Sequence, residues 1–103
     1  MHIVKVTYTV RAEFAERNKE NIGKVMADMR EINNGGIRYA TYLSEDGKTF
    51  MHFAQFREKE LQQILFDLES FKNFQKELKE SSPEVGVKQE VMQLVDAGYE
   101  LFA

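Results

Sequence analysis

Hydrophobic and polar side chains alternate along three stretches of the chain, and in two others they recur at helical spacing. Alternation predicts strands, because a strand points successive side chains to opposite faces; they are expected over about residues 3–10, 37–43 and 49–56. Spacings of three and four predict helices from about residue 12 to 32 and from soon after residue 56 to about residue 81. A last strand is expected within residues 87–95.

The resulting order is strand, helix, strand, strand, helix, strand. This order predicts a ferredoxin-like βαββαβ sandwich of the α+β class. Right-handed crossovers would put both helices on one face of a four-stranded antiparallel sheet. The chain has 103 residues, an ordinary size for one domain, and we expect residues 1–103 to form a single domain.

Turn-forming residues mark the ends of these elements. The run 33–36 (Asn-Asn-Gly-Gly) is expected to end the first helix, because Asn and Gly tolerate the left-handed backbone of a C-cap. The run 81–83 (Ser-Ser-Pro) ends the second, because the residue before a proline avoids helical angles. Asp46-Gly47 predicts a type I′ hairpin turn. With these two residues as the turn, the register pairs Leu43 with Phe50, Thr41 with His52, Tyr39 with Ala54 and Ile37 with Phe56.

This register sorts the strand residues onto two faces. The more apolar inner face is expected to lie beneath the helices and holds Val4, Val6, Tyr8, Val10, Ile37, Tyr39, Thr41, Leu43, Phe50, His52, Ala54 and Phe56. The outer face holds Lys5, Thr7, Thr9, Arg38, Ala40, Tyr42, Met51, Phe53 and Gln55. The helical stripes expected to cover the inner face are Ala15, Ile22, Val25, Met26, Met29 and Ile32, then Leu61, Ile64, Leu65, Leu68, Phe71, Gln75 and Leu78, with Phe66 and Phe74 at the flanks.

The outer face is apolar enough to predict a partner, since contiguous apolar patches usually mark contact sites. Two copies packed sheet to sheet would form a symmetric homodimer. The residues expected at this interface are Tyr42, Met51, Phe53 and Arg38, together with the tail residues Tyr99, Leu101 and Phe102. The alternative is a monomer whose outer face is solvated.

Four polar residues fall on the inner face: Tyr8, Tyr39, Thr41 and His52. Buried polar atoms need hydrogen-bond partners. One interpretation is a ligand pocket that these four line together with Met26, Met29 and Phe71. His52 would then be the catalytic acid–base residue, because its unperturbed pKa lies near neutrality. The other interpretation is structural, a histidine and tyrosines bonded to one another or to backbone. A cavity of about 300 Å³ or more beside His52 favours the first interpretation, and a solid core the second.

Composition excludes several classes of function. A net charge of −3 and a pI near 5.4 argue against nucleic-acid binding; RNA-binding domains share the element order, but only Lys5 and Arg38 flank the outer aromatics. The absence of cysteine excludes thiolate chemistry and the usual zinc sites, and glutamates without histidine predict no metal site. Without a bilayer-length apolar run or a signal-like start, we expect a cytoplasmic protein with no membrane partner.

Two segments carry a family resemblance. They are residues 50–56 (Phe-Met-His-Phe-Ala-Gln-Phe), which run into the second helix, and residues 68–78 (Leu-Glu-Ser-Phe-Lys-Asn-Phe-Gln-Lys-Glu-Leu). With the element order, they make the chain similar to the dimeric α+β barrel proteins, and among these to the small antibiotic-biosynthesis-monooxygenase-like domains. Members of that superfamily include cofactor-free oxygenases of aromatic polyketides, haem-degrading enzymes, quinone-related enzymes and isomerases.

The resemblance implies a homodimer without a cofactor that binds or oxidises a small hydrophobic or aromatic molecule between sheet and helices. The haem-degrading branch relies on a Trp in a strand, a His in the second helix and an Asn in the first strand. This chain has no Trp, its first strand has no Asn, and the histidine position falls near Leu65. An amino-acid-sensing module would need a Gly-containing turn where residues 11–13 read Arg-Ala-Glu. The alternative function is a non-catalytic dimeric regulatory or structural module with a filled core.

Overall fold

The computed structural model describes residues 1–102. Four strands form one sheet: β1 (His2–Thr9), β2 (Ile37–Leu43), β3 (Thr49–Phe56) and β4 (Val85–Met92). The helices are α1 (Ala15–Ile32), α2 (Gln62–Phe66) and α3 (Glu69–Glu80), and 3₁₀ turns at Ala12–Phe14 and Lys59–Leu61 precede α1 and α2. Neighbouring strands are antiparallel, in the order β2-β3-β1-β4.

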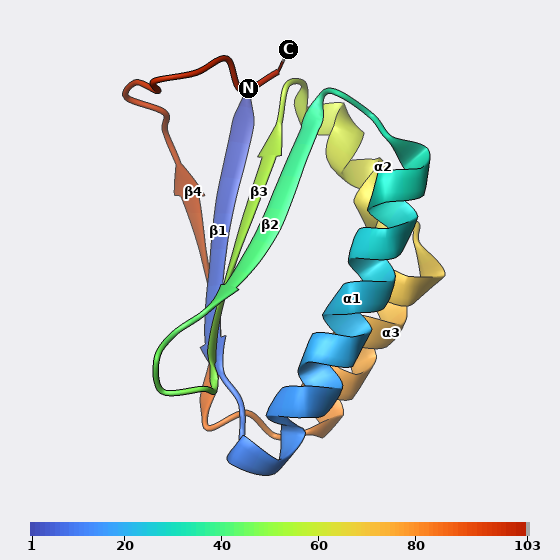
Figure 1. The fold of residues 1–103 in the computed structure, drawn as a ribbon, viewed down its shortest axis with the longest axis vertical. Coiled ribbons are helices and arrows are strands. Elements are labelled where there is room, and N and C mark those ends of the chain that lie inside the picture. Colours follow the sequence, from blue (N-terminus) through green and yellow to red (C-terminus); the bar gives the residue numbers. More distant parts are fainter. Residues whose placement is uncertain (103) are drawn as a thin grey trace.

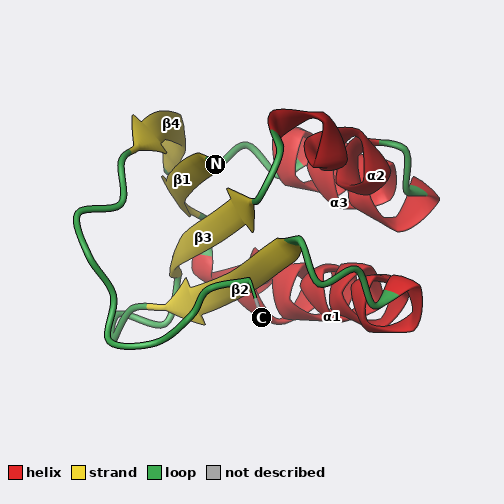
Figure 2. Ribbon diagram, turned by 90° about the horizontal axis from the view of Figure 1, so that it is seen from above, coloured by secondary structure: helices red, strands yellow, loops and turns green. Residues whose placement is uncertain are grey.

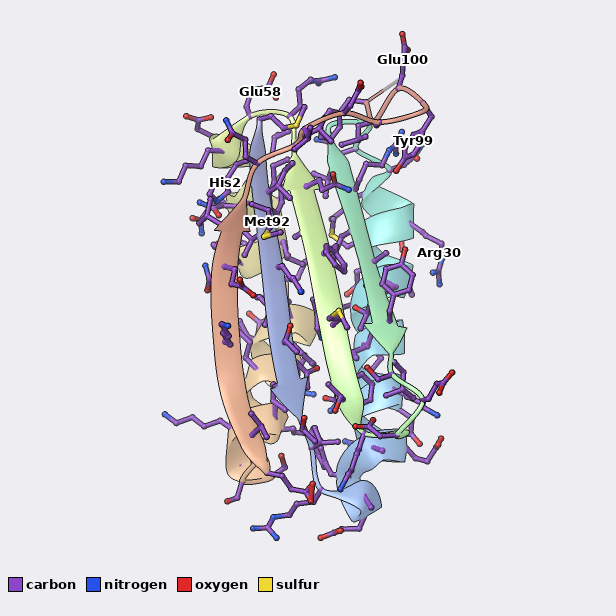
Figure 3. All side chains as sticks on the ribbon, turned by 90° about the vertical axis from the view of Figure 1, so that its left-hand side faces the viewer. His2, Arg30, Glu58, Met92, Tyr99 and Glu100 are labelled. Atoms are coloured by element: carbon purple, nitrogen blue, oxygen red, sulfur yellow. The ribbon has the colours of Figure 1, made fainter. Side chains whose placement is uncertain are left out.

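The sheet and the helices form two layers (Figure 1). Seen from above, the helices all lie on one side of the sheet (Figure 2). Seen through the sheet, α1 lies behind β2, whereas α3 lies behind β4 and β1 (Figure 3). The predicted ferredoxin-like α+β fold is therefore confirmed, with the inner face covered by two packed helices, α1 and α3.

The register of the β2–β3 hairpin is as predicted, from Ile37 opposite Phe56 to Leu43 opposite Phe50. The turn itself is not type I′. That turn needs positive φ at both central residues, and only Gly47 has it, at φ 76°. The Gly47 N–H instead donates to the Ser44 carbonyl, and the Asp46 carboxylate accepts from the backbone N–H groups of Lys48 and Thr49. The β2–β3 register is nevertheless as predicted, because it depends on the number of residues in the loop and not on the turn type.

The predicted division of the sheet into two faces is confirmed. His52 on β3 is only 4% exposed, and it faces the helices together with Tyr8 and Phe50. Met51, its neighbour in sequence, is on the other side and pairs with Thr7 of β1. Aromatic and branched side chains from both layers fill the core: Tyr8, Val10, Ala15, Val25, Ile37, Phe50, Phe56, Leu65, Phe71, Phe74 and Leu78.

Helix α1 ends as predicted, with Asn33 in the left-handed conformation at φ 51°. Its buried stripe differs from the expected one. Ile32 lies in the last turn and remains 40% exposed. Two asparagines, Asn18 and Asn21, are buried where only apolar residues were expected, and Asn18 has no exposed surface.

The second helical segment is not one helix. Leu68, with ψ 129°, has an extended backbone and separates α2 from α3. A continuous helix turns about 100° per residue, which would place Leu65 and Phe74 on opposite sides. The extended residue resets this phase, so that both side chains are buried. The spacing of the apolar residues therefore requires the break.

Strand β4 begins and ends earlier than expected, and the tail that follows it crosses the end of the sheet on its outer side and ends near β2 (Figures 1 and 2). Arg38 Nε donates to the Leu101 carbonyl at 2.7 Å, and Leu101 is buried against its own chain. Tyr99 projects from the tail and is 72% exposed (Figure 3). No helix within residues 1–102 is both long and apolar enough to cross a membrane.

Candidate functional site

A chain of hydrogen bonds crosses the centre of the inner face. Tyr8 Oη lies 2.7 Å from His52 Nε2, and Tyr39 Oη lies 2.7 Å from His52 Nδ1. Thr41 Oγ1 is 3.1 Å from the same Nδ1 atom. Asn18 Nδ2, from α1, donates to Tyr8 Oη at 2.9 Å. The four polar residues expected on this face are therefore bonded to one another, and Asn18 extends their network into the helical layer.

The strand register explains this network. On β3, His52 lies directly opposite Thr41 of β2. Tyr8 pairs with Phe50, and Tyr39 pairs with Ala54, so each tyrosine is a diagonal neighbour of His52. Diagonal positions on one sheet face are within reach of long aromatic side chains. The alternation that buries these strands thus also brings two phenols to one imidazole.

The hydrogen bonds of this network allow one consistent set of proton positions. With Asn18 Nδ2 donating to Tyr8 Oη, the Tyr8 hydroxyl can donate to His52 Nε2. A neutral imidazole with an accepting Nε2 carries its proton on Nδ1. In this tautomer, His52 Nδ1–H donates toward Tyr39 and Thr41.

Burial keeps each member of the network uncharged. Desolvation lowers the pKa of His52 to about 4, because water no longer stabilises the imidazolium. Burial likewise raises the pKa of the Tyr8 hydroxyl well above its usual value, and it does the same for Tyr39 against the opposing effect of a hydrogen bond with Thr41. Phe74 packs on the His52 ring at 5.3 Å between centroids. The site is thus neutral at physiological pH.

A cavity of about 210 Å³ adjoins this network between the sheet and α2–α3. Tyr8, Tyr39 and His52 form part of its wall with Phe71, and buried Phe74 and Leu78 also line it. More exposed residues also line it, namely Gln62, Phe66, Gln75, Val87 and Gln89. Among residues 1–102, no charged side chain lines the cavity. It is smaller than the 300 Å³ expected for a ligand site, and yet the core beside His52 is not solid.

The remaining predicted ligand residues lie elsewhere. Met26, Met29 and Thr41 line an open groove between α1 and β2, and only Tyr39 belongs to both hollows. The structure therefore divides the expected pocket into two hollows, and Tyr39 borders both. The division depends on how far each helix lies from the sheet, which strand alternation does not determine.

A second polar cluster joins α1 to α3. Arg17 contacts both carboxylate oxygens of Glu77 at 2.8 and 3.1 Å, and Asn21 Nδ2 donates to the same carboxylate. Hydrogen bonds from Arg17 and Asn21 lower the pKa of Glu77 to about 2. Two amide oxygens, Asn18 Oδ1 and Asn21 Oδ1, are buried without a partner among the described residues. Within residues 1–102, no three His, Cys, Asp or Glu side chains are grouped so as to hold a metal ion.

Sequence reasoning missed Asn18 and two of the glutamines that line the cavity, Gln62 and Gln89, whereas Gln75 belongs to the predicted inner stripe. Asn18 follows Ala15 by three residues and precedes Ile22 by four, so it lies on the helical stripe already expected to be buried. That spacing was the available signal. Gln62 and Gln89 carried no such signal, because their role depends on the position of the helix break and on the exposed edge strand β4.

Comparisons with known proteins identify the fold. No protein-family model matches the sequence, and no curated protein matches it. An antibiotic biosynthesis monooxygenase of known structure has a TM-score of 0.76 at 11% identity, covering 93% of this chain and 100% of its own. A protein from Mycobacterium tuberculosis has a TM-score of 0.77 at 17% identity, covering 95% and 98%. SnoaB, a cofactor-independent oxygenase from Streptomyces nogalater, has a TM-score of 0.69 at 11% identity, covering 96% and 98%.

This chain therefore has the ferredoxin-like fold of antibiotic biosynthesis monooxygenase-like proteins, over nearly its whole length. The resemblance expected from the sequence is confirmed at the level of the fold. At identities of 11% to 17%, the structural similarity establishes the architecture alone. The activity has to be argued from the site.

Acidification is expected to destabilise the protein through His52. An unfolded histidine binds a proton below about pH 6.5, whereas the folded-state pKa of His52 is about 4. Between these values the unfolded state binds more protons, so stability falls as the pH drops from about 6.5 to about 4, by on the order of 3 kcal/mol. Urea unfolding at several pH values across this interval measures the loss.

The variant His52→Gln isolates this effect, because glutamine can hydrogen-bond to both tyrosines and does not titrate. Its stability should fall less steeply over the interval than that of the wild type. The control is His2→Gln, which removes the chain's other histidine and should leave the wild-type slope. Equal slopes in His52→Gln and the wild type would contradict the burial of a neutral His52.

Proposed function

We propose that the protein binds a small, neutral, hydroxylated aromatic molecule in the cavity beside His52 and promotes its oxidation by O₂ without a cofactor. The observation that carries this proposal is the position of the Tyr8–His52–Tyr39 network in the wall of an uncharged cavity. The shared fold with SnoaB, a cofactor-independent oxygenase, supports the same reaction type.

The lining of the cavity indicates the class of ligand. Phe66, Phe71 and Phe74 offer aromatic surfaces on which a flat ring can pack. The carboxamides of the glutamines can bond to hydroxyl or carbonyl groups, and no charged side chain is available to neutralise an anion. A cavity of about 150 Å³ holds one benzene ring. The 210 Å³ here therefore suits one substituted ring or two small fused rings.

The chemistry needs one proton acceptor and O₂. Loss of the hydroxyl proton makes a phenol electron-rich, so that its anion can transfer an electron to O₂. Recombination at the ring carbon gives a peroxide anion, which takes back one proton to become a hydroperoxide, and loss of water gives the quinone. The balanced reaction converts one phenol and one O₂ into one quinone and one H₂O. The protein would supply the proton path, the orientation of the ring and exclusion of bulk water.

A non-catalytic dimeric module is the second candidate, and one observation favours it. Both ring nitrogens of His52 already have hydrogen-bond partners, so no lone pair points freely into the cavity. A network of this kind can simply satisfy the polar atoms of a core. The two candidates differ in whether the cavity admits a ligand.

Binding and turnover of 1-naphthol test the first candidate. We expect 1-naphthol to raise the melting temperature of the wild type, and we expect oxygen uptake with formation of 1,4-naphthoquinone. His52→Gln should lower kcat by at least about a hundredfold, within the range of general acid–base catalysis. Ala54→Leu, which fills part of the cavity, should abolish the thermal shift.

The control is Tyr42→Phe, because Tyr42 lies on the outer face away from the cavity. A range of phenols and quinones that neither shift the melting temperature nor consume oxygen would favour the non-catalytic module.

We further propose that the outer face is the interface of a homodimer. Tyr42 on this face is 60% exposed, and its ring meets the Phe53 ring edge-on at 6.0 Å. Exposed Met92 lies on the same side of the sheet (Figure 3). These side chains form an apolar patch with Met51, and burial against a second copy would remove it from water. Tyr99 and Phe102 would extend this interface from the tail.

Phe53→Asp tests the dimer. Sedimentation of the wild type should give twice the chain mass. A buried unpaired carboxylate costs several kcal/mol, so the variant should dissociate at least about a hundredfold more readily. The control is Val91→Asp, which adds the same charge at an exposed position of β4. A wild type that sediments as a monomer at all concentrations would contradict the proposal.

A further inference from the structure

The hydrogen-bond network of the inner face connects the two hollows of the molecule. Tyr8 and His52 line the cavity beneath α2–α3 but not the groove beneath α1, whereas Thr41 lines the groove but not the cavity. Tyr39 lines both. The hydrogen bonds therefore run from the cavity-lining Tyr8 through His52, with steps of 2.7 Å on each side of the imidazole, to Tyr39, the residue that borders both hollows.

We propose that Tyr8, His52 and Tyr39 form a proton relay that carries the proton of a cavity-bound hydroxyl to water in the α1–β2 groove. The relay rests on the proposed function only in naming that hydroxyl as the source of the proton. Tyr8 and His52 would be catalytic residues, and Tyr39 is the exit. Thr41 is a positioning residue, because it contacts the same nitrogen as Tyr39.

The proton positions allow transfer in this direction. The substrate proton moves to Tyr8 Oη while the Tyr8 proton moves to His52 Nε2, which is free to accept it. The Nδ1 proton of His52 moves to Tyr39 Oη, and the Tyr39 proton moves to groove water. One proton leaves the cavity and the substrate becomes an anion. Each relay residue ends with the number of protons it had, so its net charge is unchanged.

Burial favours this concerted route over a base that stores charge. An imidazolium at His52 and a phenolate at Tyr8 are both disfavoured by desolvation, so neither accumulates. A relay residue that loses one proton as it gains another forms neither the imidazolium nor the phenolate. The route also explains how a histidine with two bonded nitrogens can serve as an acid–base group.

Asn18 allows the relay to return to its starting state. In the present orientation its Nδ2 donates to Tyr8, and its Oδ1 has no partner among the described residues. After amide rotation, Oδ1 would accept from the Tyr8 hydroxyl and Nδ2 would lose its partner. Each orientation makes one hydrogen bond and leaves one amide atom unpaired. Reversal of the hydrogen-bond direction therefore loses no bond at Asn18.

Imidazole NMR tests the relay without any substrate. In ¹⁵N-labelled protein, His52 should show a protonated Nδ1 and an unprotonated Nε2 at neutral pH, with His2→Gln identifying the second histidine. Exchange of the Nδ1 proton with water should be at least about tenfold slower in Tyr39→Phe than in the wild type, because the exit hydroxyl is lost. Tyr42→Phe, on the outer face, should exchange at the wild-type rate.

Unchanged exchange in Tyr39→Phe would overturn the relay, as would a protonated Nε2 in the wild type. Backbone amides of β3 report general opening of the sheet, and faster exchange at His52 and β3 together would also overturn it. If 1-naphthol is oxidised, Tyr39→Phe should lower kcat and leave KM unchanged. Slowed exchange in a protein that oxidises no phenol would refute the proposed function alone, and oxidation with wild-type exchange in Tyr39→Phe would refute the relay alone.

Discussion

The pairing of β3 with both of its neighbours is the constraint on which the site depends. A shift of one residue in either pairing would turn His52 to the outer face and bring Met51 under the helices. Buried Phe50 and Phe56 on the same face of β3 resist such a shift, because both would leave the core together. The packing of apolar side chains therefore holds the imidazole in place, and the polar network depends on that packing.

The network in turn decides what the core can do chemically. Burying His52 and Asn18 costs free energy that hydrogen bonds only partly offset, and an unpaired Asn18 Oδ1 adds to that cost. A purely structural core would be better served by apolar side chains of similar volume, since a partly satisfied polar network is less favourable than an apolar core. The relay proposed above would give these two buried polar residues a role that offsets this cost.

The parts of the structure that depend on local alternation could be predicted from the sequence. The strands, their faces, the β2–β3 register and the burial of His52 all follow from the period of two. The break at Leu68 could not be found by matching residues one at a time to a helical stripe, because the conflict shows only when Leu65 and Phe74 are compared. Asn18 lies on the buried stripe by its position, but asparagine is usually an exposed residue type, so its burial is not expected from composition. The two separate hollows depend on the distance between layers, which no pattern along the chain encodes.

The break in the helical layer also explains why a cavity lies beside His52. Leu65 of α2 and Phe71 of α3 come from opposite sides of the extended Leu68, and both line the cavity. On a continuous helix, Leu65 and Phe71 would lie about 120° apart, so the two side chains would not both face the cavity. At the exposed edge, β4 contributes Val87 and Gln89 to the lining and extends beyond the cover of the helices, which leaves an opening there. Proteins that share this fold at 11% to 17% identity share its architecture, and the residues that line the hollow have to be read from this chain. In this chain those residues are uncharged, which favours a neutral molecule as the ligand of the proposed site.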